Sequence, residues 1–398
     1  MTADAVITPL PAHRPPPRVP HRPESPTAGN SMVRHIRESF AAVEPRAEET
    51  ARFFYAMLFS LAPQVRDLFP ANMEVQRSRL LRALVHVVQM VDRPDELVPF
   101  LRQLGRDHRK FGVILEHYEA VGIALLAAVR RYAGDAWTPV VEGAWANAYT
   151  VIATTMQDAA ASDVGPAWWS ATVVDHQRLA WDLAVVRLQP DQPVPYRAGQ
   201  YVSVEVPQRR RVWRYLSPAN APRPDGVVEF HIRAVKGGWV SRAVVGHGRI
   251  GDVWRIGPPM GRLGVDRRAG RDVLMVAGGT GIAPMRAILE ELSRWGDNPA
   301  VQVFFGGRTR ADLYDLDILH GLAATNPWLT VVPVVESELR VPGAEHGTLA
   351  DVVTRRGAWT DRDVLVCGSP SMIRATVSRM LVAGTPLDRI RYDPFTLD

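Results

Sequence analysis

A glycine-rich turn that follows an apolar run constrains the fold of this chain more than any other feature. The apolar run covers residues 273–277, and residues 285–292, after the turn, have a helical pattern. A buried strand that ends in glycines and leads into a helix presents backbone N–H groups to a pyrophosphate. The C-terminal part of the chain is therefore predicted to bind a nucleotide. The residues of the turn are Gly278, Gly279, Thr280 and Gly281.

Length and composition exclude several classes of protein. A chain of 398 residues is too long for one ordinary core, so two or three domains are expected. No apolar run reaches the roughly 18 residues of a membrane span, and the N-terminus lacks the apolar core of a signal peptide. The net charge of +5 is spread over interspersed basic and acidic residues, which argues against nucleic-acid binding. Cys367 is the one cysteine, so no internal disulfide can form, as is usual in the reducing cytoplasm. We therefore expect a cytoplasmic protein without stable membrane insertion. The sequence leaves its oligomeric state open.

The hydrophobic pattern changes along the chain and divides it into a leader and three domains. Residues 1–30 are rich in proline and are predicted to be a disordered leader. Residues 31–161 have a helical period, which predicts an all-α domain. Residues 162–266 contain short alternating runs between Pro and Gly turns, typical of a small antiparallel β-barrel. Residues 267–398 alternate strands with helices, typical of a doubly wound parallel α/β sheet. The predicted strands are residues 184–188, 201–206, 227–235 and 253–256 in the barrel and 273–277, 301–305, 329–335 and 364–367 in the parallel sheet.

Four histidines of the helical domain are candidate axial ligands for haem: His35, His86, His108 and His117. Each of them taken alone is more often a surface or core-edge residue. His108 differs because it ends a helical segment and is followed by Phe111 and then by a long apolar helix. His86 lies mid-helix among valines, where core packing accounts for it. His108 is therefore the candidate iron ligand.

The sequence resembles the flavohaemoglobins across nearly everything after the leader. The similar strings are FFYAMLF at residues 53–59, VRDLF at 65–69, DH at 107–108 and HYEAVG at 117–122. The spacings are similar too, with 14 residues from Tyr55 to Phe69 and 32 from Gln76 to His108. The resemblance implies a globin, then an antiparallel FAD-binding barrel, then a doubly wound NAD(P)-binding domain.

For the globin, the resemblance implies a haem b pocket with named residues on each side of the iron. His108 would be the proximal ligand, and Phe69 would pack on the haem face. Tyr55 and Gln76 would be the distal hydrogen-bonding pair, with Leu80 as a distal apolar wall. A phenol donor in a dry pocket stabilises oxygen bound to iron, which agrees with the buried aromatic helix around Tyr55.

The proximal side departs from the family in one respect. In the family a glutamate near the end of the last globin helix completes a relay with the histidine and a tyrosine. Here Tyr118 matches the tyrosine, but Ala160 stands at the glutamate position. Asp158, the nearest carboxylate, is predicted to point to the opposite helix face. Without that acid His108 is expected to donate less charge to iron.

The flavin-binding strand also departs from the family pattern. In the family an Arg-x-Tyr-Ser motif holds the flavin, and the matching string is Arg214-Tyr215-Leu216-Ser217. Arg214 and Ser217 match, as a phosphate-binding cation and a hydroxyl that bonds the flavin. Leu216 replaces the tyrosine that lies against the isoalloxazine, and Tyr215 is shifted by one position, which turns its side chain to the other face of the strand.

Other segments of the C-terminal half resemble the family's cofactor-binding segments. Cys367 is expected to pack beside the nicotinamide rather than act as a nucleophile, because no activating base is adjacent. Arg308 and Arg310 are candidates for contact with a 2′-phosphate, and they leave NADH and NADPH equally open. For FAD the implied residues are Gly237, Gly238, Val240 and Ser241, with Phe395 as an aromatic cover. For NAD(P)H, beyond the glycine turn, they are Gly307, Arg308, Cys367 and Gly368.

The resemblance implies that electrons pass from NAD(P)H through FAD to haem-bound O₂, which reacts with nitric oxide (NO) to give nitrate. Its small-molecule partners are then O₂, NO and NAD(P)H. The departures at Ala160 and Leu216 leave open a divergent member with another electron donor or acceptor, such as a lactate-like acid or a quinone. A non-catalytic haem-based oxygen or redox sensor is the third hypothesis. It requires a signalling module or a partner for the basic leader, of which Arg14, Arg18 and Arg22 are candidates.

Overall fold

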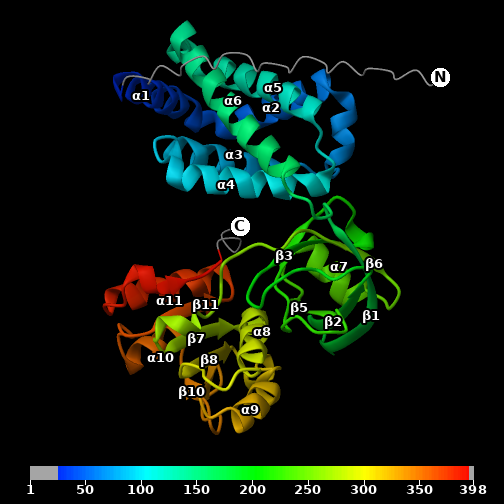
Figure 1. Cartoon of the computed structure of the whole chain (residues 1–398), viewed down its shortest axis with the longest axis vertical. Coiled ribbons are helices and arrows are strands. Elements are labelled where there is room, and N and C mark those ends of the chain that lie inside the picture. The colour runs from blue at the N-terminus through cyan, green and yellow to red at the C-terminus, as the bar shows by residue number, and fades with distance from the viewer. Residues whose placement is uncertain (1–25, 394–398) are drawn as a thin grey trace, which may run out of the picture.

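The computed structural model describes residues 26–393, with the backbone alone for residues 26–30 (Figure 1). Helix α1 (Pro26–Val43) begins five residues before the predicted start of the helical domain at residue 31. The rest of the predicted leader, including its three arginines, lies outside the described residues, as does Phe395. Three bodies follow one another along the described chain: a helical domain, a β-barrel and an α/β domain (Figure 1).

Six described α-helices form the first domain around a main apolar core and a smaller apolar cluster that contains Leu97, Leu101 and Met156. Pro94 and Pro139 each begin a helix, where proline loses no hydrogen bond because the first N–H groups have no partner within the helix. Among the described residues no single helix is long and apolar enough to cross a membrane. The helical segments 94–111 and 115–136 meet that test of length and composition only as a pair, and the pair is bent by 115°. After α1 the helices are α2 (Ala47–Leu61), α3 (Glu74–Met90), α4 (Pro94–His108), α5 (Leu115–Ala133) and α6 (Pro139–Ala161).

The second domain is a nearly closed antiparallel barrel, as the alternating pattern predicts. Its strand order is β4-β3-β6-β1-β2-β5, and a bridge between Pro218 and Phe230 joins the two edges. The sequence pattern missed β1, because the second half of that strand is polar and exposed and shows no apolar alternation. The elements are β1 (Trp169–Ala180), β2 (Leu183–Pro190), β3 (Val202–Glu205), β4 (Arg214–Leu216), β5 (Val228–Arg233), α7 (Trp239–His247) and β6 (Val253–Ile256).

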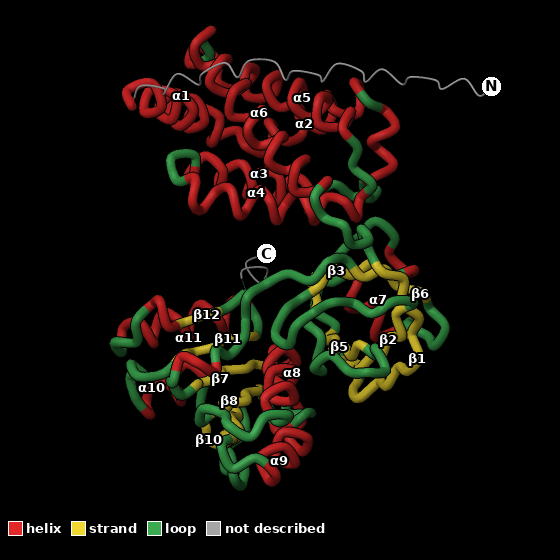
Figure 2. Tube along the Cα trace, viewed as in Figure 1, coloured by secondary structure: helices red, strands yellow, loops and turns green. Residues whose placement is uncertain are grey.

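The third domain is a parallel sheet with helices on both faces, again as predicted (Figure 2). Its strand order is β10-β9-β8-β7-β11-β12. Along β7, Met275 packs in the layer of α8 and α9, whereas Leu274 and Val276 pack in the layer of α10 and α11. The strands are β7 (Val273–Gly278), β8 (Val301–Gly307), β9 (Leu329–Val335), β10 (Glu345–His346), β11 (Asp363–Cys367) and β12 (Ile390–Arg391). The helices are α8 (Ile282–Leu292), α9 (Leu316–Thr325), α10 (Leu349–Arg356) and α11 (Pro370–Val382).

The close approach of α4 to α6 depends on a glycine, and this gives a test of the helical packing. A Cβ at Gly105 would lie 2.2 Å from the backbone oxygen of Met156, which cannot move aside without shifting α6. Gly105→Ala is expected to lower the free energy of unfolding of the helical domain by about 1–3 kcal/mol, as measured by denaturant titration with circular dichroism. Gly143→Ala is the matched control, because nothing lies within 4 Å of its Cβ and alanine suits an exposed helix better. Equal effects of the two substitutions would contradict this packing.

Candidate functional site

His108 lies at the last position of α4 with one ring nitrogen already bonded. Its Nδ1 is 2.8 Å from the carbonyl oxygen of Leu104, and since a carbonyl only accepts, Nδ1 must donate. This hydrogen bond fixes the tautomer and leaves Nε2 as the basic atom available to a metal. Burial lowers the pKa of the His108 imidazole, which keeps it neutral, as a ligand must be.

The residues predicted for the distal side come together between α2 and α3. The hydroxyl of Tyr55 donates to the backbone oxygen of Gln76 at 3.2 Å, and the Phe69 ring centroid lies 5.5 Å from that of Tyr55. Leu80 packs against the same core. The side-chain oxygen of Gln76 is buried and has no hydrogen-bond partner within the described chain, which is costly unless a bound group satisfies it. Burial raises the pKa of Tyr55 far above its ordinary value, so it remains a neutral phenol and a donor.

The structure also places His86 and the residues predicted near the proximal side of the haem. The ring of His86 packs against that of Phe100, with centroids 4.5 Å apart, which is a core contact. Tyr118 is half-buried, burial raises its pKa, and its backbone oxygen accepts from the hydroxyl of Tyr149. Asp158 is exposed on α6 and Ala160 carries no acid. The predicted role of Tyr118 beside the iron stays a prediction.

Strand β4 shows the consequence of the shifted tyrosine. In the antiparallel register Tyr215 lies opposite Ser203, and Leu216 lies opposite Val202. Leu216 packs against the barrel core, whereas the Tyr215 ring turns to the other face, 5.3 Å from the ring of Tyr201. The half-buried residues Arg214 and Ser217 bracket this strand, in the order expected of a flavin-binding strand.

Two glycines, Gly237 and Gly238, lie directly before the start of α7. Gly237 has a φ of +78°, a value that side-chain-bearing residues rarely adopt, and α7 begins directly after Gly238. The side chain of Val240 is buried in the barrel core, so only its backbone N–H can face an anion. The Ser241 hydroxyl accepts a hydrogen bond from the N–H of Val235 at 3.4 Å, which closes the turn. This arrangement suits a phosphate at a helix N-terminus.

The glycine turn after β7 is pressed against the end of β11. Gly279 has a φ of +54°, and a Cβ at Gly281 would lie 2.4 Å from the backbone oxygen of Cys367. Cys367 is buried and its pKa is raised by burial, which supports the packing role predicted for it. A Cβ at Gly307, where β8 ends, would meet the side chain of Asp312 at 2.5 Å, while Arg308 beside it is exposed.

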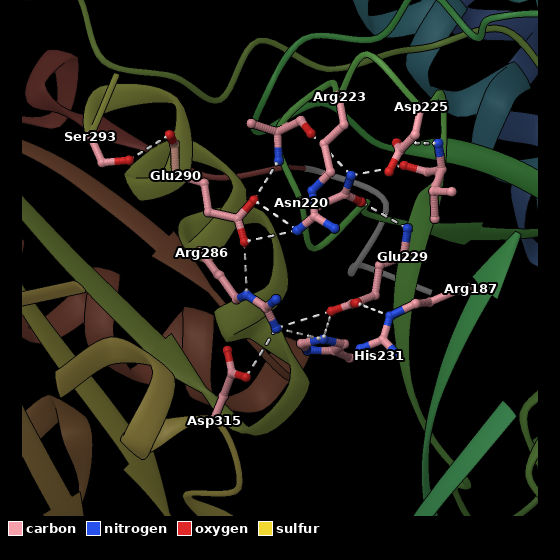
Figure 3. A network of polar contacts seen from close by, with 12 residues as sticks. Arg187, Asn220, Arg223, Asp225, Glu229, His231, Arg286, Glu290, Ser293 and Asp315 are labelled. Carbon is pink, nitrogen blue, oxygen red and sulfur yellow. Dashed lines mark hydrogen bonds and ion pairs between the residues drawn. The ribbon is translucent and has the colours of Figure 1, made fainter. Parts of the chain in front are cut away.

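A buried polar cluster joins the barrel to the α/β domain, and sequence reasoning missed it (Figure 3). Arg286 of α8 is its centre: Nη1 lies 3.0 Å from Oε1 of Glu229 on β5 and 3.1 Å from Oδ1 of Asp315. Its Nε donates to Oε1 of Glu290 at 3.2 Å. His231 lies 3.0 Å from Glu229 and closes the cluster. No motif indicates the contacts of Arg286 with Glu229 and Asp315, because these partners are far apart in sequence.

The charges in this cluster change the acidity of Glu229. Burial alone would raise its pKa, but the hydrogen bond from His231 and the charges of Arg286 and Arg187 lower it to about 2. Because this lies below the ordinary value of 4.5, the carboxylate stabilises the folded state above pH 4.5. That contribution is lost as the pH falls from 4.5 towards 2.

Replacing this carboxylate gives a second test. Glu229→Gln leaves Arg286 with less compensation in a buried site, so the free energy of unfolding at pH 7 is expected to fall by about 3 kcal/mol. Its loss of stability between pH 4.5 and pH 2 should also be smaller than in the unchanged protein. Denaturant unfolding at several pH values measures both effects. Glu38→Gln, at an exposed ion pair, is the control and should change neither.

Comparison with known protein families matches all three domains. Residues 52–156 match the globin family. Residues 170–264 match the oxidoreductase FAD-binding domain family, and residues 275–378 match the oxidoreductase NAD-binding domain family. The matches follow the order of the three bodies in the structure.

Some similar proteins cover nearly the whole chain, and others cover only its C-terminal half. The flavohemoprotein of Bacillus subtilis is 25% identical over 390 residues, which cover 92% of this chain and 97% of that protein. The ferredoxin–NAD(P)⁺ reductase component of the naphthalene 1,2-dioxygenase system of Pseudomonas putida is 31% identical over 233 residues, or 56% of this chain and 68% of that protein. The crystal structure of flavohemoglobin from Malassezia yamatoensis with bound FAD and heme has the same fold, with a TM-score of 0.76 at 18% identity over 91% of this chain and 98% of that one.

Proposed function

The chain belongs to the flavohaemoglobin family, and on that premise we propose that it oxidises nitric oxide to nitrate with O₂ and NAD(P)H. Its cofactors are haem, FAD and NAD(P)H, and it is an oxidoreductase that carries electrons from NAD(P)H through FAD to haem. When bound, FAD accepts a hydride and releases single electrons, and haem iron coordinates oxygen. The proposed reaction converts two NO, two O₂ and one NAD(P)H to two nitrate ions, one NAD(P)⁺ and one proton.

The pairing of Tyr55 with Gln76 is the observation that carries the proposal. A neutral phenol and a buried amide oxygen, which has no hydrogen-bond partner in the described chain, belong to residues that contact each other between α2 and α3. With haem bound, the Tyr55 phenol would donate to a ligand on the iron, and its buried surroundings would strengthen that hydrogen bond. We assign the iron ligand to Nε2 of His108, since its Nδ1 is held by Leu104.

The reductase half supplies positions for the two nucleotides. We assign the FAD phosphates to Arg214 and the N-terminus of α7, with Ser217 bonding the flavin. The turn 278–281 would hold the NAD(P)H pyrophosphate, and Cys367 with Gly368 would border the nicotinamide. In this arrangement a leucine, not a tyrosine, lies on the flavin side of β4.

That leucine supports a second candidate function. Tyr215 is turned away from the predicted flavin position, so bound flavin would have a leucine as its neighbour. Its potential and its preferred electron donor would then differ from those of relatives with a tyrosine at that position. A lactate-like acid as donor, or a quinone as acceptor, is then the alternative to the dioxygenase reaction. The third hypothesis, a sensor without turnover, predicts no sustained NAD(P)H oxidation with any acceptor.

Nitric oxide consumption tests the proposal directly. The protein purified with haem and FAD is mixed with NADH or NADPH, oxygen and NO, and both NO loss and nitrate are measured. We expect NAD(P)H-dependent loss of NO with nitrate formed in equal amount. Negligible NAD(P)H oxidation when NO and O₂ are both present would refute the dioxygenase reaction, and rapid oxidation with a quinone in the same preparation would favour the alternative.

The distal donor has its own test. Tyr55→Phe removes the hydroxyl and keeps the ring, so the rate of O₂ dissociation from the reduced protein is expected to rise by about 10-fold to 100-fold, as expected for a lost hydrogen bond in a dry pocket. Flash photolysis or stopped-flow mixing measures this rate. Tyr132→Phe, on α5 beside Arg46, is the matched control and should leave it unchanged. An unchanged rate in Tyr55→Phe would remove this residue from the pocket.

A further inference from the structure

The chain uses lysine very rarely, and one of its lysines is buried. Of 47 lysine and arginine residues, only Lys110 and Lys236 are lysines. Lys236 is exposed on the barrel, whereas the side chain of Lys110 is only 1% exposed. A buried ammonium is costly unless it is paired and hydrogen-bonded, so the surroundings of Lys110 need an explanation.

The Lys110 ammonium bridges the globin and the barrel. Its Nζ lies 2.5 Å from Oδ1 of Asp107, in the last turn of α4. The same Nζ donates at 2.9 Å to the hydroxyl of Ser203 on β3 of the barrel. A charged hydrogen bond that crosses a domain boundary in a buried site holds the two domains in one geometry.

Three aromatic rings surround the same ammonium. Its Nζ lies 5.0 Å from the ring centroid of Phe111, 5.2 Å from that of Trp213 and 5.5 Å from that of Tyr215. Each of these distances is within the range of a cation–π contact, which is stronger in a desolvated site. Two of the rings come from the barrel, so the barrel forms most of the cage.

Strands β3 and β4 build this cage by their register. Ser203 and Tyr215 are direct partners across the two strands, so their side chains project from the same face. We call the site formed around the Lys110 ammonium by Asp107, Ser203 and the three rings the socket. A Cβ at Gly257 would lie 2.3 Å from the Ser203 hydroxyl and 3.4 Å from Cδ of Lys110, so the socket has no spare room there. The one-residue shift that takes Tyr215 away from the flavin position puts its ring beside Lys110.

Two of the residues around the Lys110 ammonium are close in sequence to predicted cofactor ligands. Lys110 follows the proposed iron ligand His108 by two residues, and the cage residue Trp213 precedes the proposed flavin ligand Arg214. Phe111 packs edge-on against Trp213, with ring centroids 6.2 Å apart. The short segment after α4 therefore contacts the barrel directly where both cofactors are expected.

We propose that Lys110 is a positioning residue for electron transfer, which docks the globin on strands β3 and β4 so that FAD can reduce the haem iron. The inference rests on the flavin-to-haem step of the proposed function. One NADH supplies two electrons to FAD, which passes them one at a time and reduces ferric iron to ferrous. Lys110 takes no electron or proton in this step; it fixes the distance over which each electron moves.

A second ion pair at the boundary between the globin and the barrel is exposed to solvent. Arg211 of the barrel lies 3.8 Å from Asp67 of the globin, with side chains 50% and 83% exposed. Such a pair contributes little, because water and salt screen it. Asp67→Asn therefore serves as a matched control that removes a cross-domain charge contact without touching the socket.

The test follows the two electron-transfer steps separately in the full protein. Under anaerobic conditions with carbon monoxide to trap ferrous haem, stopped-flow mixing with NADH records flavin bleaching and the Soret shift. In Lys110→Met the rate of flavin reduction and the KM for NADH should stay within about twofold, as should turnover with ferricyanide as acceptor. Haem reduction should slow by about tenfold or more, as expected for loss of a buried charged contact.

A second variant guards against misfolding of the first. Ser203→Ala removes one hydroxyl from the barrel side and leaves the Lys110–Asp107 pair in the globin intact. It should slow haem reduction about twofold to fivefold, in the same direction, while Asp67→Asn leaves it unchanged. Haem reduction at the unchanged rate in both socket variants, or an equal slowing of flavin and haem reduction, would overturn the assignment. Failure of NADH to reduce haem in the unaltered protein would instead refute the proposed function.

Discussion

Buried charges at the two domain boundaries determine how the three domains meet. Lys110 pairs with Asp107 and Ser203 between globin and barrel, and Arg286 pairs with Glu229 and Asp315 between barrel and α/β domain. Apolar contacts tolerate sliding, whereas a buried ion that loses its partners is strongly destabilising. An electron-transfer chain needs its carriers at short and fixed separations, and buried ions supply that constraint where the domain surfaces alone would not.

The elements with a regular local pattern were the ones that the sequence predicted well. Strands β6 and β9 have the predicted bounds, and Tyr55 and Gln76 come together as the resemblance implied. The polar half of β1 carried no alternation and was missed. The polar contacts across the domain boundaries were missed for another reason: Lys110 and Ser203 are 93 residues apart, and no local pattern records a contact of that span. The rarity of lysine was the one available signal.

The one-position shift of the tyrosine on β4 has effects on both sides of the strand. It leaves Leu216 against the barrel core on the side where the resemblance places a tyrosine, and it places Tyr215 beside the ammonium from the globin. Since successive side chains of a strand point to opposite faces, moving one tyrosine by one position transfers its ring from one face to the other. The altered flavin neighbour and the aromatic cage are therefore one structural change seen from two faces.

The glycine turn after β7 packs on β11, so the reactivity of the single cysteine reports on opening at this end of the sheet. The turn leaves no room for a Cβ over the backbone of Cys367, and the thiol beneath is buried and protonated. Because the sulfur is buried, an alkylating reagent reaches it only when the C-terminal end of β11 opens. Exposure also lets the thiol form the thiolate, which is the reactive form. The rate of alkylation thus measures how often the nucleotide end of the sheet opens, and a bound dinucleotide that holds the turn closed would protect the sulfur.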